Sequence, residues 1–224
     1  MTREELLKIA KPVLFNTDMV RAIIRRDKSV TRRCVKPSQL IGLTPDKCKN
    51  KLPEEFIKEK PLLFLPYSRM TDEDLIQSIY KSPFEAGDYL YVRETWNYID
   101  FAGEENGYVY KVSDNGQLWE TETENWKWRP SIHMPKEAAR IFLKVTGVKA
   151  ERLQNMTVED AHKEGIDVRT HAIADGERLN PNSDFSLEHF EILWDSTIDK
   201  KNIKIYGWNA NPFTWVIEFE LVEL

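Results

Sequence analysis

The alternation of hydrophobic and polar positions along the chain predicts short strands separated by short helices. An apolar run at residues 12–15 indicates a buried strand, and residues 19–24 then carry apolar side chains at helical spacing. Asn16 or Thr17 can cap this helix, because a short side-chain oxygen accepts a hydrogen bond from the first turn. A second short strand is expected at 29–31. The chain therefore begins with a strand–helix–strand unit.

The same patterns predict the elements of the remaining chain. Residues 37–86 are rich in proline, which indicates an insertion on a smaller fold. Several short strands without a βαβ repeat favour an α+β fold: a small closed or half-closed β-barrel with flanking helices and inserted loops. The expected elements are a helix within 1–10 packed through Leu6, Leu7 and Ile9, short elements at 54–59 and 62–65, a helix at 72–80 capped by Thr71, strands at 89–96, 108–112 and 141–148, a helix at 158–164 capped by Thr157 and stopped by Gly165, a helix at 187–198 capped by Ser186, and a strand at 214–222.

Positive charge is concentrated near the start of the chain. Residues 21–36 hold seven cations and one anion, Asp27, a net charge of +6, whereas the whole chain carries −5. A basic face on an acidic protein indicates one site for an anionic ligand rather than general coating by nucleic acid. A solvated helix face followed by a charged turn explains the same pattern equally well.

Composition narrows the class of protein. A hydrophobic content of 41% supports a real core. The two cysteines, Cys34 and Cys48, are too few for a disulfide framework, which indicates a reduced intracellular protein. No apolar run approaches the roughly 18 residues that a membrane span needs, and the first ten residues form an amphipathic pattern rather than a signal peptide. We therefore expect a cytoplasmic protein without a membrane partner.

No motif in the sequence indicates a cofactor. The four histidines show no metal-ligand spacing, and no cluster of carboxylates suggests a metal site. The chain has no glycine-rich phosphate loop. We therefore expect neither a metal nor an organic cofactor.

Four blocks of sequence resemble a known family. The blocks are DKSVTRR at 27–33, GDYLYVRE at 87–94, DAHKEG at 160–165 and WVIEF at 215–219. Together they resemble the ASCH domain of the PUA-like superfamily, and the longer form with RETW at 93–96 and LWD at 193–195 is similar to ASCH-related proteins of bacteriophages and prophages. The resemblance implies a single ASCH/PUA-like domain over residues 1–224, with insertions at about 37–86, 97–138 and 167–185.

The resemblance also implies a function. Its barrel has a cleft that handles a nucleobase, nucleoside or RNA, so the expected partner is a nucleoside, a nucleotide or RNA. One branch of small bacterial ASCH proteins is similar to an amidohydrolase that removes the acetyl group from N4-acetylcytidine. Its lysine, its threonine three positions later and its helical glutamate fall on Lys28, Thr31 and Glu164. This chain is about twice the size of that enzyme, and the pair Arg32-Arg33 departs from its pattern.

Amide hydrolysis gives each of these three residues a role. The Thr31 hydroxyl would attack the carbonyl carbon, and Lys28 would take its proton if nearby cations or burial favour the neutral amine. Glu164 would protonate the leaving nitrogen or bond the amino edge of the base. Structural roles fit the same residues: Lys28 suits a helix end, Thr31 a strand and Glu164 the surface of a helix.

Further cations and aromatic residues extend the predicted binding surface. Arg93 and Glu94 form either a pair that holds a phosphate and a base edge or a cross-strand ion pair. Trp128 and Arg129 stand in a polar segment suited to stacking and phosphate contact, although most tryptophans belong to cores. The candidate nucleic-acid contacts are Arg25, Arg26, Arg32, Arg33, Arg93, Glu94, Trp128 and Arg129.

Three functions remain open from the sequence. The first is an enzyme that hydrolyses an amide or a phosphodiester on a modified nucleoside or RNA, which needs Lys28, Thr31 and Glu164 close together. The second is a non-catalytic reader of RNA or of a modified base, which tolerates Thr31→Val. The third is a protein-interaction module, which needs an exposed apolar patch.

Overall fold

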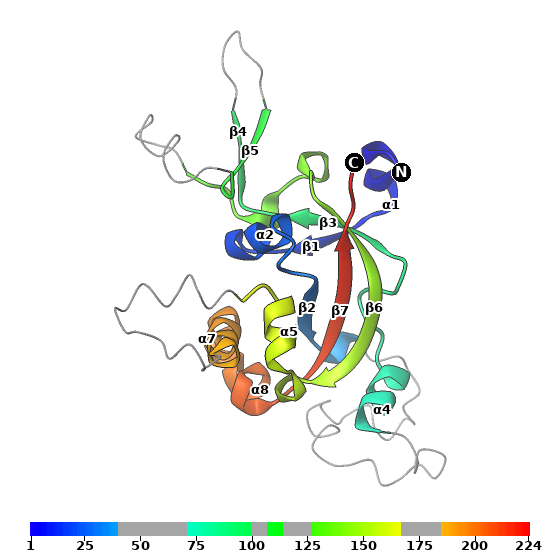
Figure 1. Ribbon diagram of the computed structural model, residues 1–224, viewed down its shortest axis with the longest axis vertical. Coiled ribbons are helices and arrows are strands. Elements are labelled where there is room, and N and C mark those ends of the chain that lie inside the picture. Colours follow the sequence, from blue (N-terminus) through cyan, green and yellow to red (C-terminus); the bar gives the residue numbers. More distant parts are fainter. Residues whose placement is uncertain (40–70, 100–106, 114–126, 167–184) are drawn as a thin grey trace. The chain divides into compact units, whose positions relative to one another are not determined.

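The computed structural model describes residues 1–39, 71–99, 107–113, 127–166 and 185–224 (Figure 1). The chain divides into two compact units. The first unit contains Met1–Ser29, Ala86–Thr146 and Phe219–Leu224, and the second contains Val30–Glu85 and Gly147–Glu218. The short elements predicted at 54–59 and 62–65 lie outside the described residues, as do most of the three predicted insertions. That the two units form one domain stays a prediction.

The α+β class is confirmed, whereas a closed barrel is not. In the first unit the elements are α1 (Arg3–Ile9), β1 (Lys11–Leu14), α2 (Thr17–Ile24), β3 (Tyr89–Arg93), β4 (Trp96–Ile99), β5 (Gly107–Tyr110), η4 (Ser131–His133) and η5 (Lys136–Ala138). In the second they are β2 (Val30–Cys34), η1 (Pro37–Gln39), α4 (Asp72–Ile79), η6 (Leu153–Asn155), α5 (Val158–Lys163), α7 (Ser186–Thr197), η7 (Lys200–Asn202), α8 (Ile203–Tyr206) and η8 (Trp208–Ala210). The strands β6 (Phe142–Arg152) and β7 (Phe213–Leu221) have residues in both units.

The strands form one five-stranded and one two-stranded sheet. The larger sheet has the order β1-β3-β6-β7-β2, and the smaller consists of β4 and β5. Among the described residues the larger sheet keeps two edges, β1 and β2, so it does not close into a barrel. Within the first unit β1 runs parallel to β3, and β3 runs antiparallel to β6. Within the second unit β2 runs antiparallel to β7, with Arg32 opposite Val216.

The predicted strand–helix start is confirmed, with one change to its apolar face. The side chain of Asn16 accepts a hydrogen bond from the Met19 amide at 2.8 Å and caps α2. The helix ends at Ile24, and Arg26 turns the chain with a φ of 66°. The buried face is Val20, Ala22 and Ile23, and Ile24 is 47% exposed. The predicted apolar face of the helix included Ile24, which lies on the solvent side instead.

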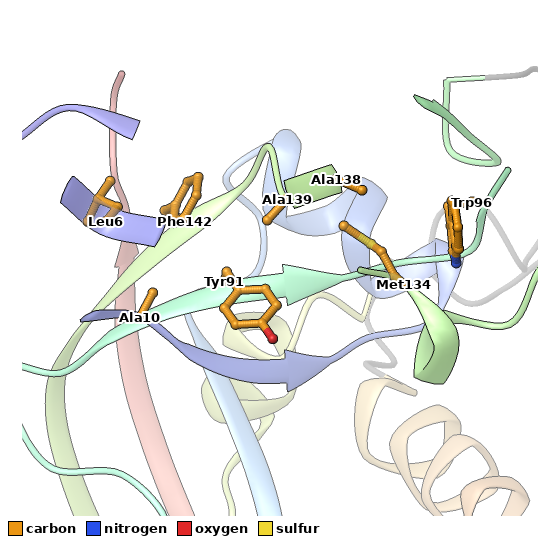
Figure 2. Packing of buried hydrophobic residues seen from close by; sticks show 8 residues of the cluster. All are labelled: Leu6, Ala10, Tyr91, Trp96, Met134, Ala138, Ala139 and Phe142. Carbon is orange, nitrogen blue, oxygen red and sulfur yellow. The ribbon is translucent and has the colours of Figure 1, made fainter. Parts of the chain in front are cut away.

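Apolar residues from several elements form a core in the first unit. Figure 2 shows this cluster, in which α1 contributes Leu6 and β6 contributes Phe142, with Trp96 and Met134 at its other end. Leu6 is fully buried and Leu7 packs partly, whereas Ile9 is 55% exposed, so the prediction for Ile9 was wrong. The short helix α1 presents only one narrow apolar stripe to the core. Trp96, with 5% exposure, belongs to this core.

The second unit has a separate helical core and two predictable helix ends. Thr157 caps α5 in a reciprocal capping box with Asp160, as predicted. Gly165 then turns the chain with a φ of 85°, a conformation that suits glycine after a helix. Phe190 and Trp194 of α7 pack with Leu153, Met156 and Ala161. The predicted cap of α7 was wrong: Ser186 is the first helical residue, and its hydroxyl lies 3.4 Å from the His162 ring.

Candidate functional site

A buried arginine in the second unit brings three carboxylates together. Arg32 lies in the middle of β2 with 1% of its side chain exposed. Its Nη1 donates a hydrogen bond to Oε1 of Glu164 at 3.3 Å. Its Nη2 lies 3.5 Å from Asp160 and 3.8 Å from Glu151. Such a group is costly to bury unless it is paired, so these ion pairs explain how β2 can hold an arginine inside.

The carboxylates come from two elements that the local sequence fixes well. Glu151 stands near the end of β6, Asp160 lies in the first turn of α5, and Glu164 is the C-cap residue of the same helix. A spacing of four residues places two side chains on one face of a helix, which here faces β2 (Figure 1). The cap at Thr157 and the stop at Gly165 set where this helix begins and ends. The two carboxylates of α5 therefore meet Arg32 because of signals that are visible in the sequence.

Burial and charge shift two pKa values in this cluster. Burial acts to raise the pKa of Asp160, but the hydrogen bonds from Thr157 and the charge of Arg32 outweigh it, so the pKa lies below its ordinary value. Burial lowers the pKa of Arg33, and the nearby charge of Glu164 opposes that shift. Glu164 thus lies close to both arginines of the pair that distinguishes this chain from the amidohydrolase pattern.

All three predicted catalytic residues are buried. Thr31 is 1% exposed and Glu164 is 7% exposed in the second unit, and Lys28 is 3% exposed in the first. The Lys28 ammonium lies 5.7 Å from the centre of the Phe15 ring. Consecutive strand residues point to opposite faces of a sheet, so Thr31 and Arg32 leave β2 on opposite sides. That the three residues converge on one substrate stays a prediction.

The predicted basic surface divides into exposed and buried arginines. Arg25 and Arg26 are exposed, and Arg26 forms an ion pair with Glu223 at 2.5 Å within the first unit. Arg33 is half-buried and donates to the backbone oxygen of Arg32 at 3.1 Å. Arg32 itself departs from the prediction, because it lies inside the protein among carboxylates rather than on an exposed basic surface.

Arg93 and Glu94 do not form a pair with each other. Arg93 donates to the backbone oxygens of Ile132 and of Met134, the latter at 3.1 Å. Glu94 is 1% exposed and receives two hydrogen bonds from Arg140, at 2.9 and 3.1 Å. The guanidinium of Arg140 also covers the Tyr110 ring at 3.9 Å. Glu94 therefore forms an ion pair with a residue 46 positions away, which the sequence does not indicate.

Among the described residues near Trp128, two tyrosines are exposed. Trp128 is half-buried, and the exposed Arg129 lies 5.1 Å from the buried ring of Trp96. Tyr98 of β4 and Tyr108 of β5 face each other across the two-stranded sheet at 5.2 Å, with 42% and 37% exposure. Their alternation with Trp96 and Tyr110 could have indicated this aromatic face from the sequence.

Comparison with protein-family models, with curated proteins and with solved structures gives no match to this chain. In the described part of the chain, no group of three or more histidine, cysteine, aspartate or glutamate side chains is arranged to hold a metal ion. None of the helices described is both long and apolar enough to cross a membrane.

Proposed function

We propose that this chain is a PUA-like protein that binds a nucleoside, a nucleotide or RNA through the carboxylate of Glu164. The observation that carries the proposal is the burial of Glu164 beside Arg32, at 7% exposure and 3.3 Å. Among the described residues, nine polar or charged side chains are buried, and the three residues that the resemblance selects are all among them. Charged side chains are seldom buried outside paired or functional positions, so this coincidence supports a functional site.

The ion pair with Arg32 supports one of the two roles considered for Glu164. A carboxylate in an ion pair is ionised, and an ionised carboxylate accepts hydrogen bonds but donates none. It therefore suits the amino edge of a base such as cytosine better than it suits protonation of a leaving nitrogen. The favoured ligand is a nucleoside whose base carries an exocyclic amino group.

Calorimetry with the purified full-length chain tests the binding proposal. Cytidine and uridine are titrated into the wild type, into Glu164→Gln and into Glu159→Gln, which changes an exposed glutamate on the same helix. We expect binding of cytidine that weakens by about tenfold to a hundredfold in Glu164→Gln, the range of a hydrogen bond to a charged group, and is unchanged in Glu159→Gln. Equal affinity of all three proteins for cytidine, or no binding, would refute the proposal.

A further inference from the structure

The guanidinium of Arg32 lies near two carboxylates besides that of Glu164. Its Nη2 lies between Asp160 at 3.5 Å and Glu151 at 3.8 Å, and its Nη1 donates to Glu164. A guanidinium is a rigid planar fork, so the attraction of the two carboxylates near Nη2 also influences the direction in which Nη1 donates. The orientation of Glu164 therefore depends on the charges of Asp160 and Glu151.

The two bracing carboxylates are themselves anchored. Asp160 accepts a hydrogen bond from the Thr157 amide at 3.0 Å in the capping box of α5. Glu151 forms an ion pair with Lys149 at 2.8 Å. Each therefore has a structural partner besides Arg32. Partners of this kind orient the residues that touch a ligand, as outer-shell groups orient metal ligands.

Arg32 also keeps donor capacity that the described residues do not use. Its Nε and Nη2 have no hydrogen-bond partner among them, because Asp160 and Glu151 stand beyond ordinary hydrogen-bond distance. Satisfying every donor would serve stability best, since unsatisfied buried donors are costly. In the structure, the hydrogen bond from Arg32 to a carboxylate is instead the one from Nη1 to Glu164.

We infer that Arg32 is a positioning residue that determines base specificity: its guanidinium holds the Glu164 carboxylate in one orientation as a hydrogen-bond acceptor, so that the site takes bases with an amino group and rejects bases with a carbonyl there. The inference rests on the proposed function. A carbonyl oxygen placed against an ionised carboxylate leaves two acceptors facing each other, which costs the desolvation of both. Cytidine should therefore bind, and uridine, which differs from it at this edge, should be rejected.

The test compares cytidine with uridine by calorimetry in four variants of the full chain. Arg32→Met removes the cation, and Arg32→Lys keeps a positive charge but loses the planar fork. Asp160→Asn removes the charge of one of the two carboxylates near Nη2. Glu159→Gln is the matched control, because Glu159 is an exposed carboxylate of the same helix that pairs with Lys163. Circular dichroism establishes that each variant is folded.

We expect the wild type to prefer cytidine by at least about tenfold, the worth of one good hydrogen bond to a charged group. Arg32→Met and Arg32→Lys should lose most of this preference, Asp160→Asn should lose part of it, and Glu159→Gln should keep it. A protein that merely lost stability would lose affinity for both nucleosides together and keep their ratio. If Arg32→Met does not fold, Arg32→Lys and Asp160→Asn decide the question.

Two failures are distinguishable. If the wild type binds neither nucleoside, the proposed function is wrong and this inference falls with it. If the wild type prefers cytidine and Glu164→Gln abolishes that preference while folded Arg32 variants retain it, Glu164 acts without Arg32 and only this inference is overturned.

Discussion

Replacement of Arg140 by methionine should destabilise the protein strongly, because it leaves the carboxylate of Glu94 buried without its partner. Glu94 has 2% of its side chain exposed and receives two hydrogen bonds from Arg140, at 2.9 and 3.1 Å. Methionine preserves much of the length and apolar surface of arginine, so it removes the charge and the donors with little loss of packing.

The size of the effect follows from the contacts. Breaking a buried ion pair by removing one partner costs about 3–5 kcal/mol. Arg140 keeps 33% of its side chain in contact with solvent, which screens part of the interaction, so we take about 2–3 kcal/mol. Loss of its contact with the Tyr110 ring at 3.9 Å adds about 0.5–1 kcal/mol. The expected destabilisation is therefore about 3 kcal/mol.

Urea unfolding monitored by fluorescence and by circular dichroism measures this change. For a slope near 3 kcal/mol per molar urea, 3 kcal/mol corresponds to a midpoint shift of about 1 M. The double variant Glu94→Gln with Arg140→Met is the control, because a neutral amide is much less costly to bury than an unpaired carboxylate. We expect it to recover part of the lost stability.

The result also separates a structural from a ligand-binding role of Glu94. A shift below about 0.2 M for Arg140→Met would refute the argument, because it would mean that the buried carboxylate does not depend on this partner. A reduction of nucleoside affinity in Glu94→Gln, without loss of stability, would restore the predicted ligand contact.

Three further predictions concern the second unit. Gly165→Ala should cost about 1 kcal/mol, measured by thermal unfolding, because the φ of 85° disfavours a side chain. Burial raises the pKa of Cys34 to about 11, so in a Cys48→Ser background its alkylation at about pH 8 should be about a hundredfold slower than that of an exposed thiol. The pKa of Asp160 lies below its ordinary value, so its stabilisation is complete above the unfolded value and is lost as the pH falls through the folded value. Urea unfolding should therefore show a smaller loss of stability between about pH 6 and about pH 3 in Asp160→Asn than in the wild type.

Each of these predictions has a contradicting outcome. Unchanged thermal stability of Gly165→Ala would mean that the chain leaves α5 in another way. Rapid alkylation at about pH 8 would show that Cys34 is not buried as described. Equal acid sensitivity of Asp160→Asn and the wild type would show that the hydrogen bonds from Thr157 and the charge of Arg32 do not lower the pKa of Asp160.

The sequence predicted well those features that depend on neighbouring residues. The caps at Asn16, Thr71 and Thr157 and the stop at Gly165 are confirmed, because each depends on one side chain or one turn of backbone. Ser186 has the right chemistry for a cap and is nevertheless the first helical residue, beside His162. Tertiary contact overrides a local preference at that position.

Long-range pairing explains what the sequence did not indicate. Arg32 and Glu164 are 132 residues apart, and Glu94 and Arg140 are 46 apart. The cluster of positive charges at residues 21–36 predicted that Arg32 is exposed. A pattern of charges does not indicate which carboxylates of other elements will lie beside Arg32 in the folded protein. The selection of Glu164 came from a resemblance, and its ion pair gives that residue a physical reason to be an acceptor.

Calorimetric titration of cytidine into the wild type and into Glu164→Gln tests the central claim most directly. We predict that cytidine binds measurably to the wild type. Its affinity should fall by about tenfold or more in Glu164→Gln while the variant stays folded. Equal binding by both proteins, or no binding by the wild type, would contradict the claim that the carboxylate held by Arg32 receives the amino group of a base.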